Sequence, residues 1–153
     1  MQSDEIVKLN LRHGWLGWWP KTGLKAILDP ENARITQFLI EQSARLPENS
    51  LLLDAGAGKC PYKYIFEDFD YQSTDMPGGF YDQPHDFECE LHDIPKNDNT
   101  YNAVILTQVL EHVPDPGATL TEICRVLKPN GKLLLSVPLN GPLHGEPWHY
   151  FQF

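Results

Sequence analysis

The sequence lacks any hydrophobic run long enough to cross a membrane. Its apolar runs, such as YNAVILT at 101–107, stay far below the roughly 20 residues that a membrane-spanning helix needs. The N-terminal segment MQSDEIVKLNLRHGWLGWW also lacks the basic start and apolar core of a secretory signal. We therefore expect a cytoplasmic protein with no transmembrane segment.

Cysteines and basic residues are both scarce. The three cysteines, at positions 60, 89 and 124, are widely spaced and form no CxxC pair, so we expect reduced thiols and no metal site. Lys and Arg number 12 against 21 Asp and Glu, which gives a formal net charge of −9. Because binding to phosphate backbones needs clustered basic residues, we expect no nucleic-acid partner.

Two common phosphate-binding motifs are also missing. The sequence contains no GxxxxGK[ST] motif, which disfavours ATP or GTP bound by a P-loop. In the segment LLLDAGAGKCPY (51–62), Gly56 and Gly58 fit a dinucleotide-binding turn, but Pro61 occupies the position of its third glycine. NAD and nucleotide-sugar binding therefore remain only as less favoured alternatives.

Helix and strand patterns alternate along the chain. Asp29 and Pro30 begin a helix that we expect to end near residue 46, and Pro129 to Gly131 should end a later helix that begins at Pro116. A short helix is predicted at 61–69, and strands are predicted at 51–54, 71–74, 87–91, 101–107 and 132–137. This alternation predicts an α/β fold with an open, mostly parallel, Rossmann-like sheet flanked by helices.

The first 29 residues differ from the rest of the chain. They hold a cluster of tryptophans, Trp15, Trp18 and Trp19, and no clear strand pattern. We interpret residues 1–29 as an aromatic flap and residues 30–153 as one ligand-binding domain.

Carboxylates follow the first two predicted strands. Asp54 precedes Gly56 and Gly58, and Asp75 ends the second strand. The carboxyl ends of parallel strands meet at one edge of a sheet, where such folds bind their ligands. Glycines after the first strand allow bare backbone to approach a ligand, so the pattern predicts a nucleotide-binding turn.

Three segments, in this order along the chain, resemble the motifs of class I S-adenosylmethionine-dependent methyltransferases, in particular those of the type 11 group. They are the turn from Asp54 to Cys60, IPKNDNTYNAVILTQVLEHVPDP (94–116), and RVLKPNGKLLLSVP (125–138). The resemblance spans roughly residues 30–145. It implies S-adenosylmethionine as cofactor and methyl transfer as the activity.

The resemblance also implies roles for individual residues. Asp54 would hold the methionine amino group, Gly56 and Gly58 would let the backbone approach the cofactor, and Asp75 would accept hydrogen bonds from the ribose hydroxyls. The remaining cofactor-binding positions implied by the resemblance are Met76, Glu90 and Leu91 around the adenine, and Thr107 and Gln108 at the methionine end.

The sequence departs from the family pattern in two places. Cys60 stands where the family often has a third glycine. The family's sheet has a final antiparallel strand pair, whereas the predicted strands stop at the fifth, so we expect a sheet that lacks its last two strands. A partner chain or a second copy of this chain would then cover the open edge.

No catalytic residue can be assigned from the sequence. His112, His144 and His149 are candidates for a general base, although the resemblance implies that Glu111 and His112 more often shape the helix behind the cofactor, and the other two lie in a proline-containing loop. The expected function is methyl transfer to a small-molecule, lipid or sugar-containing acceptor. The alternative is a non-catalytic S-adenosylmethionine-binding or assembly module whose incomplete sheet pairs with another chain.

Overall fold

The computed structural model describes residues 30–79, 81–138 and 150–151. The chain divides into two compact units, Met1–Arg45 and Leu46–Phe153. The aromatic flap predicted for residues 1–29 lies outside the described residues, and the predicted domain division at residue 30 stays a prediction.

The described part of the first unit is the helix α3 (Pro30–Ser43). Ile35 and Leu39 are buried and lie four residues apart, so they share one face of the helix. The helix ends three residues before the predicted end at 46. Ser43 explains part of this difference, because its hydroxyl donates a hydrogen bond to the carbonyl of Ile40 at 3.0 Å and competes with the helical pattern.

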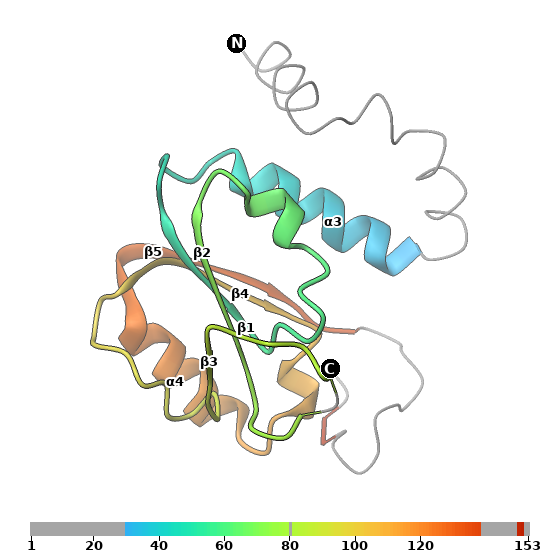
Figure 1. The fold of residues 1–153 in the computed structure, drawn as a ribbon, viewed down its shortest axis with the longest axis vertical. Coiled ribbons are helices and arrows are strands. Elements are labelled where there is room, and N and C mark those ends of the chain that lie inside the picture. The colour runs from blue at the N-terminus through green and yellow to red at the C-terminus, as the bar shows by residue number, and fades with distance from the viewer. Residues whose placement is uncertain (1–29, 80, 139–149, 152–153) are drawn as a thin grey trace. The chain divides into compact units, whose positions relative to one another are not determined.

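The second unit contains a five-stranded parallel sheet with the order β3-β2-β1-β4-β5 (Figure 1). Its strands are β1 (Leu51–Ala55), β2 (Asp70–Asp75), β3 (Phe87–Glu88), β4 (Tyr101–Thr107) and β5 (Leu127–Ser136). The chain first builds outward from β1 through β2 to β3, then returns to place β4 on the other side of β1. The predicted Rossmann-like parallel sheet is confirmed, and its strand order reverses between β1 and β4.

Three helical segments connect these strands. They are the 3₁₀ helices η1 (Lys63–Phe66) and η2 (Leu110–His112) and the α-helix α4 (Pro116–Val126). The prediction of a helix over 61–69 was therefore too long, since only four residues of it form a 3₁₀ helix. The predicted strand at 87–91 was also too long, because pairing with β2 stops at Glu88.

The predicted stop at Pro129 to Gly131 was wrong in its position. Helix α4 ends at Val126, and the following residues already belong to β5. Leu127 pairs with Tyr101, after which the register shifts until Lys132 pairs with Ala103. The turn residues thus form an irregularity within β5, where Asn130 has a φ of +65°.

Both ends of α4 have hydrogen-bond partners outside the helix. The Asp115 carboxylate accepts a hydrogen bond from the backbone N–H of Ala118 at 2.9 Å, as the Asp-Pro pattern predicts. At the other end, the backbone N–H groups of Asn99 and Thr100 donate to the carbonyls of Arg125 and Val126 at 2.9 and 2.8 Å. The turn before β4 therefore fixes the end of α4.

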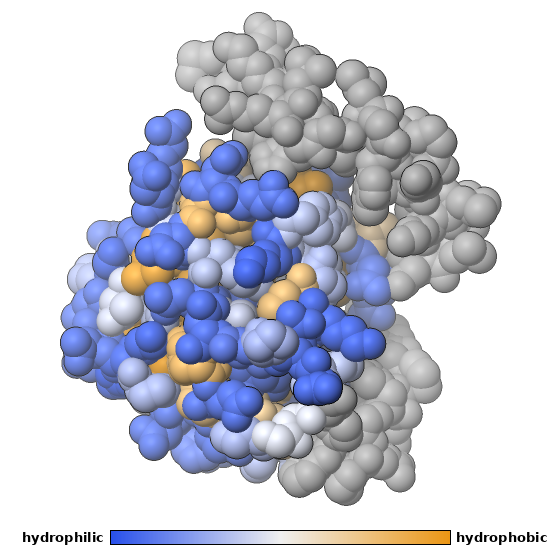
Figure 2. Space-filling model, viewed as in Figure 1, coloured by the Kyte–Doolittle hydropathy of each residue, from blue (hydrophilic) through white to orange (hydrophobic). Residues whose placement is uncertain are grey.

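Helix α4 packs on one face of the sheet through Ile123 and Val126, both fully buried. The other members of this core come from the strands, from the segment after β3 and from η2: Leu53, Ala55, Cys89, Leu91, Ile94, Tyr101, Val104, Leu106 and Leu110. In the view of Figure 2 the described surface is mainly hydrophilic, with apolar residues in small patches. Within the described ranges, no helix has the length and apolar character needed to cross a membrane.

Candidate cofactor site

The turn after β1 is attached to the end of β2. The backbone N–H groups of Gly56 and Ala57 both donate to the carbonyl of Thr74, at 2.9 and 3.0 Å. Gly56 has a φ of +71°, and a Cβ placed there would lie 2.7 Å from both γ carbons of Val109. Both the backbone conformation and the contact with the residues after β4 require glycine.

Cys60 adopts the backbone conformation expected of the missing third glycine of the turn. Its φ is +51°, in the same left-handed region as Gly58 at +53°, and its N–H donates to the carbonyl of Ala57 at 2.7 Å. A non-glycine residue in this region costs about 1–2 kcal/mol. The backbone therefore keeps the conformation that glycine would adopt.

Asp75 connects the glycine turn to the end of β2. Its Oδ2 accepts a hydrogen bond from the N–H of Gly58 at 2.8 Å, and its Oδ1 accepts one from the N–H of Met76 at 2.8 Å. Each carboxylate oxygen can accept more than one hydrogen bond. The half-buried Asp75 side chain is thus held in place and can still accept hydrogen bonds from a ligand.

Asp54 is the buried acidic residue of the site and is only 3% exposed. The hydroxyl of Tyr71 donates a hydrogen bond to its Oδ2. Burial raises the pKa of Asp54 to about 6; the Tyr71 hydrogen bond opposes this rise, and the negative charge of Asp75 adds to it. The pKa of Tyr71 is also raised, mainly by burial and then by the charge of Asp54, so Tyr71 stays protonated and remains the donor.

The ends of β4 and β5 meet beside the turn. Thr107 pairs with Ser136, and the next residue, Gln108, has a φ of +55°. Gln108 donates through its backbone N–H to the Ser136 carbonyl at 3.0 Å and through Nε2 to the Ser136 hydroxyl at 3.1 Å. Thr107 and Gln108 therefore lie at the strand ends, as predicted, and the Gln108 amide is oriented by β5.

The three residues predicted around the adenine differ in burial and in their distance along the chain from a strand end. Met76 is half-buried directly after Asp75. Glu90 is exposed and lies two residues beyond the last residue of β3, so its predicted place at a strand end was wrong. Leu91 is buried in the core. The N–H of Cys89 donates to the carbonyl of Asp75 at 3.0 Å, which keeps this segment at the end of β2.

The structure describes one of the three candidate histidines. His112 is half-buried, and its Nε2 lies 3.8 Å from Oε1 of Glu111. Glu111 is fully buried, and its carboxylate oxygens have no hydrogen-bond partner in the described part of the chain. His144 and His149 lie outside the described residues. Among residues 30–79, 81–138 and 150–151, no group of His, Cys, Asp and Glu could hold a metal ion.

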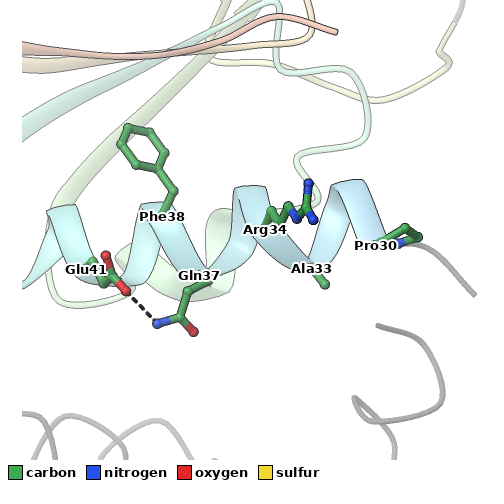
Figure 3. A pocket seen from close by; sticks show the side chains of 6 residues that line it. All are labelled: Pro30, Ala33, Arg34, Gln37, Phe38 and Glu41. Carbon is green, nitrogen blue, oxygen red and sulfur yellow. Dashed lines mark hydrogen bonds between the residues drawn. The ribbon is translucent and has the colours of Figure 1, made fainter. Parts of the chain in front are cut away.

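A hollow of about 520 Å³ lies on α3 (Figure 3). The described residues that line it all belong to this helix: Pro30, Ala33, Arg34, Gln37, Phe38 and Glu41. Within it, Gln37 donates a hydrogen bond to Glu41 at 2.7 Å. None of the strand-end residues lines this hollow, so it is not part of the candidate site.

Three residues that contact the predicted site were missed in the sequence. Val109 packs against Gly56, Tyr71 donates to Asp54, and the ring of the half-exposed Tyr81 would lie 3.1 Å from a Cβ at Gly58. The pairing of β1 with β2 would have indicated Tyr71, because Tyr71 lies opposite Leu52, two residues before Asp54. Val109 belongs to the segment 94–116 that carries the family resemblance, but that resemblance gave it no role, and Tyr81 lies outside all three segments.

Residues 27–153, which include all of the described residues, match the family described as "Methyltransferase domain". The chain belongs to this methyltransferase family. The resemblance seen in the three sequence motifs is thereby confirmed, and the family implies S-adenosylmethionine as the cofactor.

Known proteins similar to this methyltransferase-family chain are matched over part of their length. A 37-residue stretch is 51% identical to the ubiquinone biosynthesis O-methyltransferase of Xanthomonas oryzae pv. oryzae, covering 24% of this chain and 16% of that protein. A solved structure from Bacillus halodurans C-125, provisionally named a methyltransferase, has a TM-score of 0.55 and 24% identity, covering 66% of this chain and 51% of its own. The chain thus spans about half of that structure.

A third similar protein carries the name of a different reaction. The [4+2]-cyclase SpnF has a TM-score of 0.53 and 24% identity, over 65% of this chain and 42% of SpnF. At these identities the likeness shows the fold. A shared fold does not determine the reaction, which depends on the residues of the site.

The described residues fit S-adenosylmethionine. A buried carboxylate at Asp54 suits an ammonium group, and the fixed carboxylate of Asp75 suits a pair of hydroxyls. The glycine turn between them leaves no side chain at Gly56 and Gly58. The glycine turn follows β1, and the strand order reverses between β1 and β4, which is where this kind of sheet binds nucleotides.

Proposed function

We propose that this chain transfers a methyl group from S-adenosylmethionine to a small-molecule, lipid or sugar-containing acceptor. The observation that carries the proposal is the pair of carboxylates, Asp54 and Asp75, held on either side of the glycine turn. The net charge of −9 disfavours a nucleic-acid acceptor. The short match to an O-methyltransferase supports a methyl acceptor of low molecular weight.

Each group in the site has a proposed task. Asp54 binds the ammonium of the methionine moiety, Asp75 binds the ribose hydroxyls, and the turn at Gly56 and Gly58 lies against the cofactor. S-adenosylmethionine, when bound, supplies a methyl group already activated by the positive charge on its sulfur. The protein's contribution is then to align the acceptor with that methyl group and to exclude water.

The remaining proposed contacts are with the adenine and the methionine end of the cofactor. Met76, Glu90 and the Leu91 backbone would surround the adenine, and Thr107 and Gln108 would contact the methionine end. An acceptor that needs deprotonation requires a general base, for which His112, His144 and His149 remain the candidates.

Calorimetric titration with S-adenosylhomocysteine tests the cofactor site. Asp75→Ala should weaken binding by at least about 10-fold, because hydrogen bonds to a charged group contribute roughly 1.5–3 kcal/mol. Asp68→Ala, which removes an exposed acid from the turn after η1, serves as the control and should bind normally. Absence of binding by the unmodified chain would refute the proposal.

The alternative function is a non-catalytic S-adenosylmethionine-binding or assembly module. Because one structural neighbour is named a cyclase, the fold alone does not distinguish this alternative from methyl transfer. Transfer of a labelled methyl group to small-molecule and lipid fractions of a cell extract distinguishes the two. Cofactor binding without any labelled product, with size-exclusion chromatography showing a stable complex, would favour the module.

A further inference from the structure

Tyr71 reaches Asp54 across two neighbouring strands. In the β1–β2 register, Leu52 lies opposite Tyr71 and Asp54 lies opposite Ser73. Residues directly opposite each other in paired strands share a face, and so do residues two apart, so Asp54 and Tyr71 are on the same face in diagonal positions. A tyrosine side chain is long enough to span this diagonal, which places its hydroxyl at Oδ2 of Asp54.

The Tyr71 ring is held by packing that does not involve Asp54. It stacks on Phe66 of η1 with ring centroids 6.4 Å apart and an interplanar angle of 24°. The ammonium of Lys63 lies 5.4 Å from the ring centroid. Phe66 is 1% exposed, so the surface behind the ring is part of the packed interior. The position of the Tyr71 hydroxyl is therefore fixed by the packing of the ring, independently of its hydrogen bond to the Asp54 carboxylate.

A buried carboxylate is costly unless donors surround it. Tyr71 provides one such donor to Oδ2. The second oxygen of an ionised carboxylate, Oδ1, also has lone pairs that accept hydrogen bonds. We propose that Tyr71 is a positioning residue of the cofactor site, which holds Asp54 through Oδ2 so that Oδ1 pairs with the ammonium group of S-adenosylmethionine. This inference rests on the proposed function, because Asp54 has that task only if the chain binds this cofactor.

The same hydrogen bond links cofactor binding to pH. The groups around the pair are Asp75 at the end of β2, Cys60 in the turn and Lys63 on η1. Burial raises the pKa of Asp54 and the Tyr71 hydroxyl lowers it, so loss of the hydroxyl raises the pKa further. A protonated Asp54 cannot pair with an ammonium, and binding should then be lost at a higher pH.

Tyr71→Phe tests the proposal because it keeps the ring and removes the hydroxyl. Calorimetry between about pH 5 and about pH 8 compares S-adenosylhomocysteine with 5′-methylthioadenosine, which has the same nucleoside and sulfur but lacks the amino-acid end that carries the ammonium and the carboxylate. At about pH 7 the variant should bind S-adenosylhomocysteine roughly 10-fold more weakly and 5′-methylthioadenosine as the unmodified chain does. Its acid limb for S-adenosylhomocysteine should move to higher pH.

Tyr101→Phe is the matched control. The Tyr101 hydroxyl donates to Oε1 of Gln72 at 2.8 Å, and Gln72 lies opposite Leu53, on the other face of the sheet from Asp54. Loss of this hydroxyl should leave the affinity for S-adenosylhomocysteine and its pH profile unchanged. In an Asp54→Asn background, Tyr71→Phe should cause no further loss.

The outcomes separate the two proposals. If the unmodified chain binds neither ligand, the proposed function fails and this inference fails with it. If it binds both, but Tyr71→Phe leaves the affinity and pH profile for S-adenosylhomocysteine unchanged or weakens both ligands equally, the inference alone is overturned. Should Tyr71→Phe not fold, the unmodified chain can still refute the inference: an affinity for S-adenosylhomocysteine that does not fall in acid relative to that for 5′-methylthioadenosine would overturn it.

Discussion

Gly56→Ala should destabilise the protein through two separable effects. Alanine at a φ of +71° costs about 1–2 kcal/mol of backbone strain. Its Cβ would also lie 2.7 Å from both γ carbons of Val109, and overpacking of this kind costs about 1–3 kcal/mol. The free energy of unfolding should therefore fall by about 2–5 kcal/mol, measured by urea denaturation with far-ultraviolet circular dichroism.

Gly78→Ala isolates the strain because Gly78 has a φ of +66° and, among the described residues other than its chain neighbours, none has an atom within 4 Å of the added Cβ. It should lose only about 1–2 kcal/mol. Val109→Ala removes both clashing carbons, so the double variant Gly56→Ala/Val109→Ala should lose less stability than the sum of its single changes. Equal losses for Gly56→Ala and Gly78→Ala, with additive effects at Val109, would refute the contact as the reason for glycine at this position.

Two further predictions concern single acidic residues. Asp115→Ala should cost about 1 kcal/mol of unfolding free energy, because Asp115 caps the N-terminus of α4, and Asp115→Asn should cost little; equal losses would contradict a capping role. Asp54 has a pKa of about 6 when folded against its usual 3.8, so it favours the folded state below about pH 4, and this contribution is lost as the pH rises through 6. Asp54→Asn should therefore match the unmodified chain near pH 4 and exceed its stability by up to about 3 kcal/mol above pH 6, and a pH-independent difference in urea denaturation would count against this account.

The accuracy of the sequence predictions depended on where the stabilising contacts lie. Strand β4 was predicted with its observed bounds, Tyr101–Thr107, because a strand buried on both faces is apolar throughout. The predicted helix at 61–69 and strand at 87–91 were too long, because the lengths of such short segments depend on their neighbours. The end of α4 was misplaced because the residues after Val126 pair with β4.

The sequence by itself determined the class of fold, the family and the two carboxylates at strand ends. These depend on local signals: apolar periodicity, glycines directly after a strand, and acids at fixed spacing from them. Each of these patterns lies within a short stretch of sequence. It can therefore be recognised without knowing any tertiary contact.

Only the tertiary structure decided how those carboxylates are held. Asp54 receives its hydrogen bond from Tyr71, and Gly56 is confined by Val109, far along the chain. Both contacts arise from strand pairing: β2 lies on one side of β1, and β4 returns to the other. The register between strands sets which side chains meet. That register depends on which strands pair in the folded sheet, and the pattern of one strand taken alone does not say which strand will lie beside it.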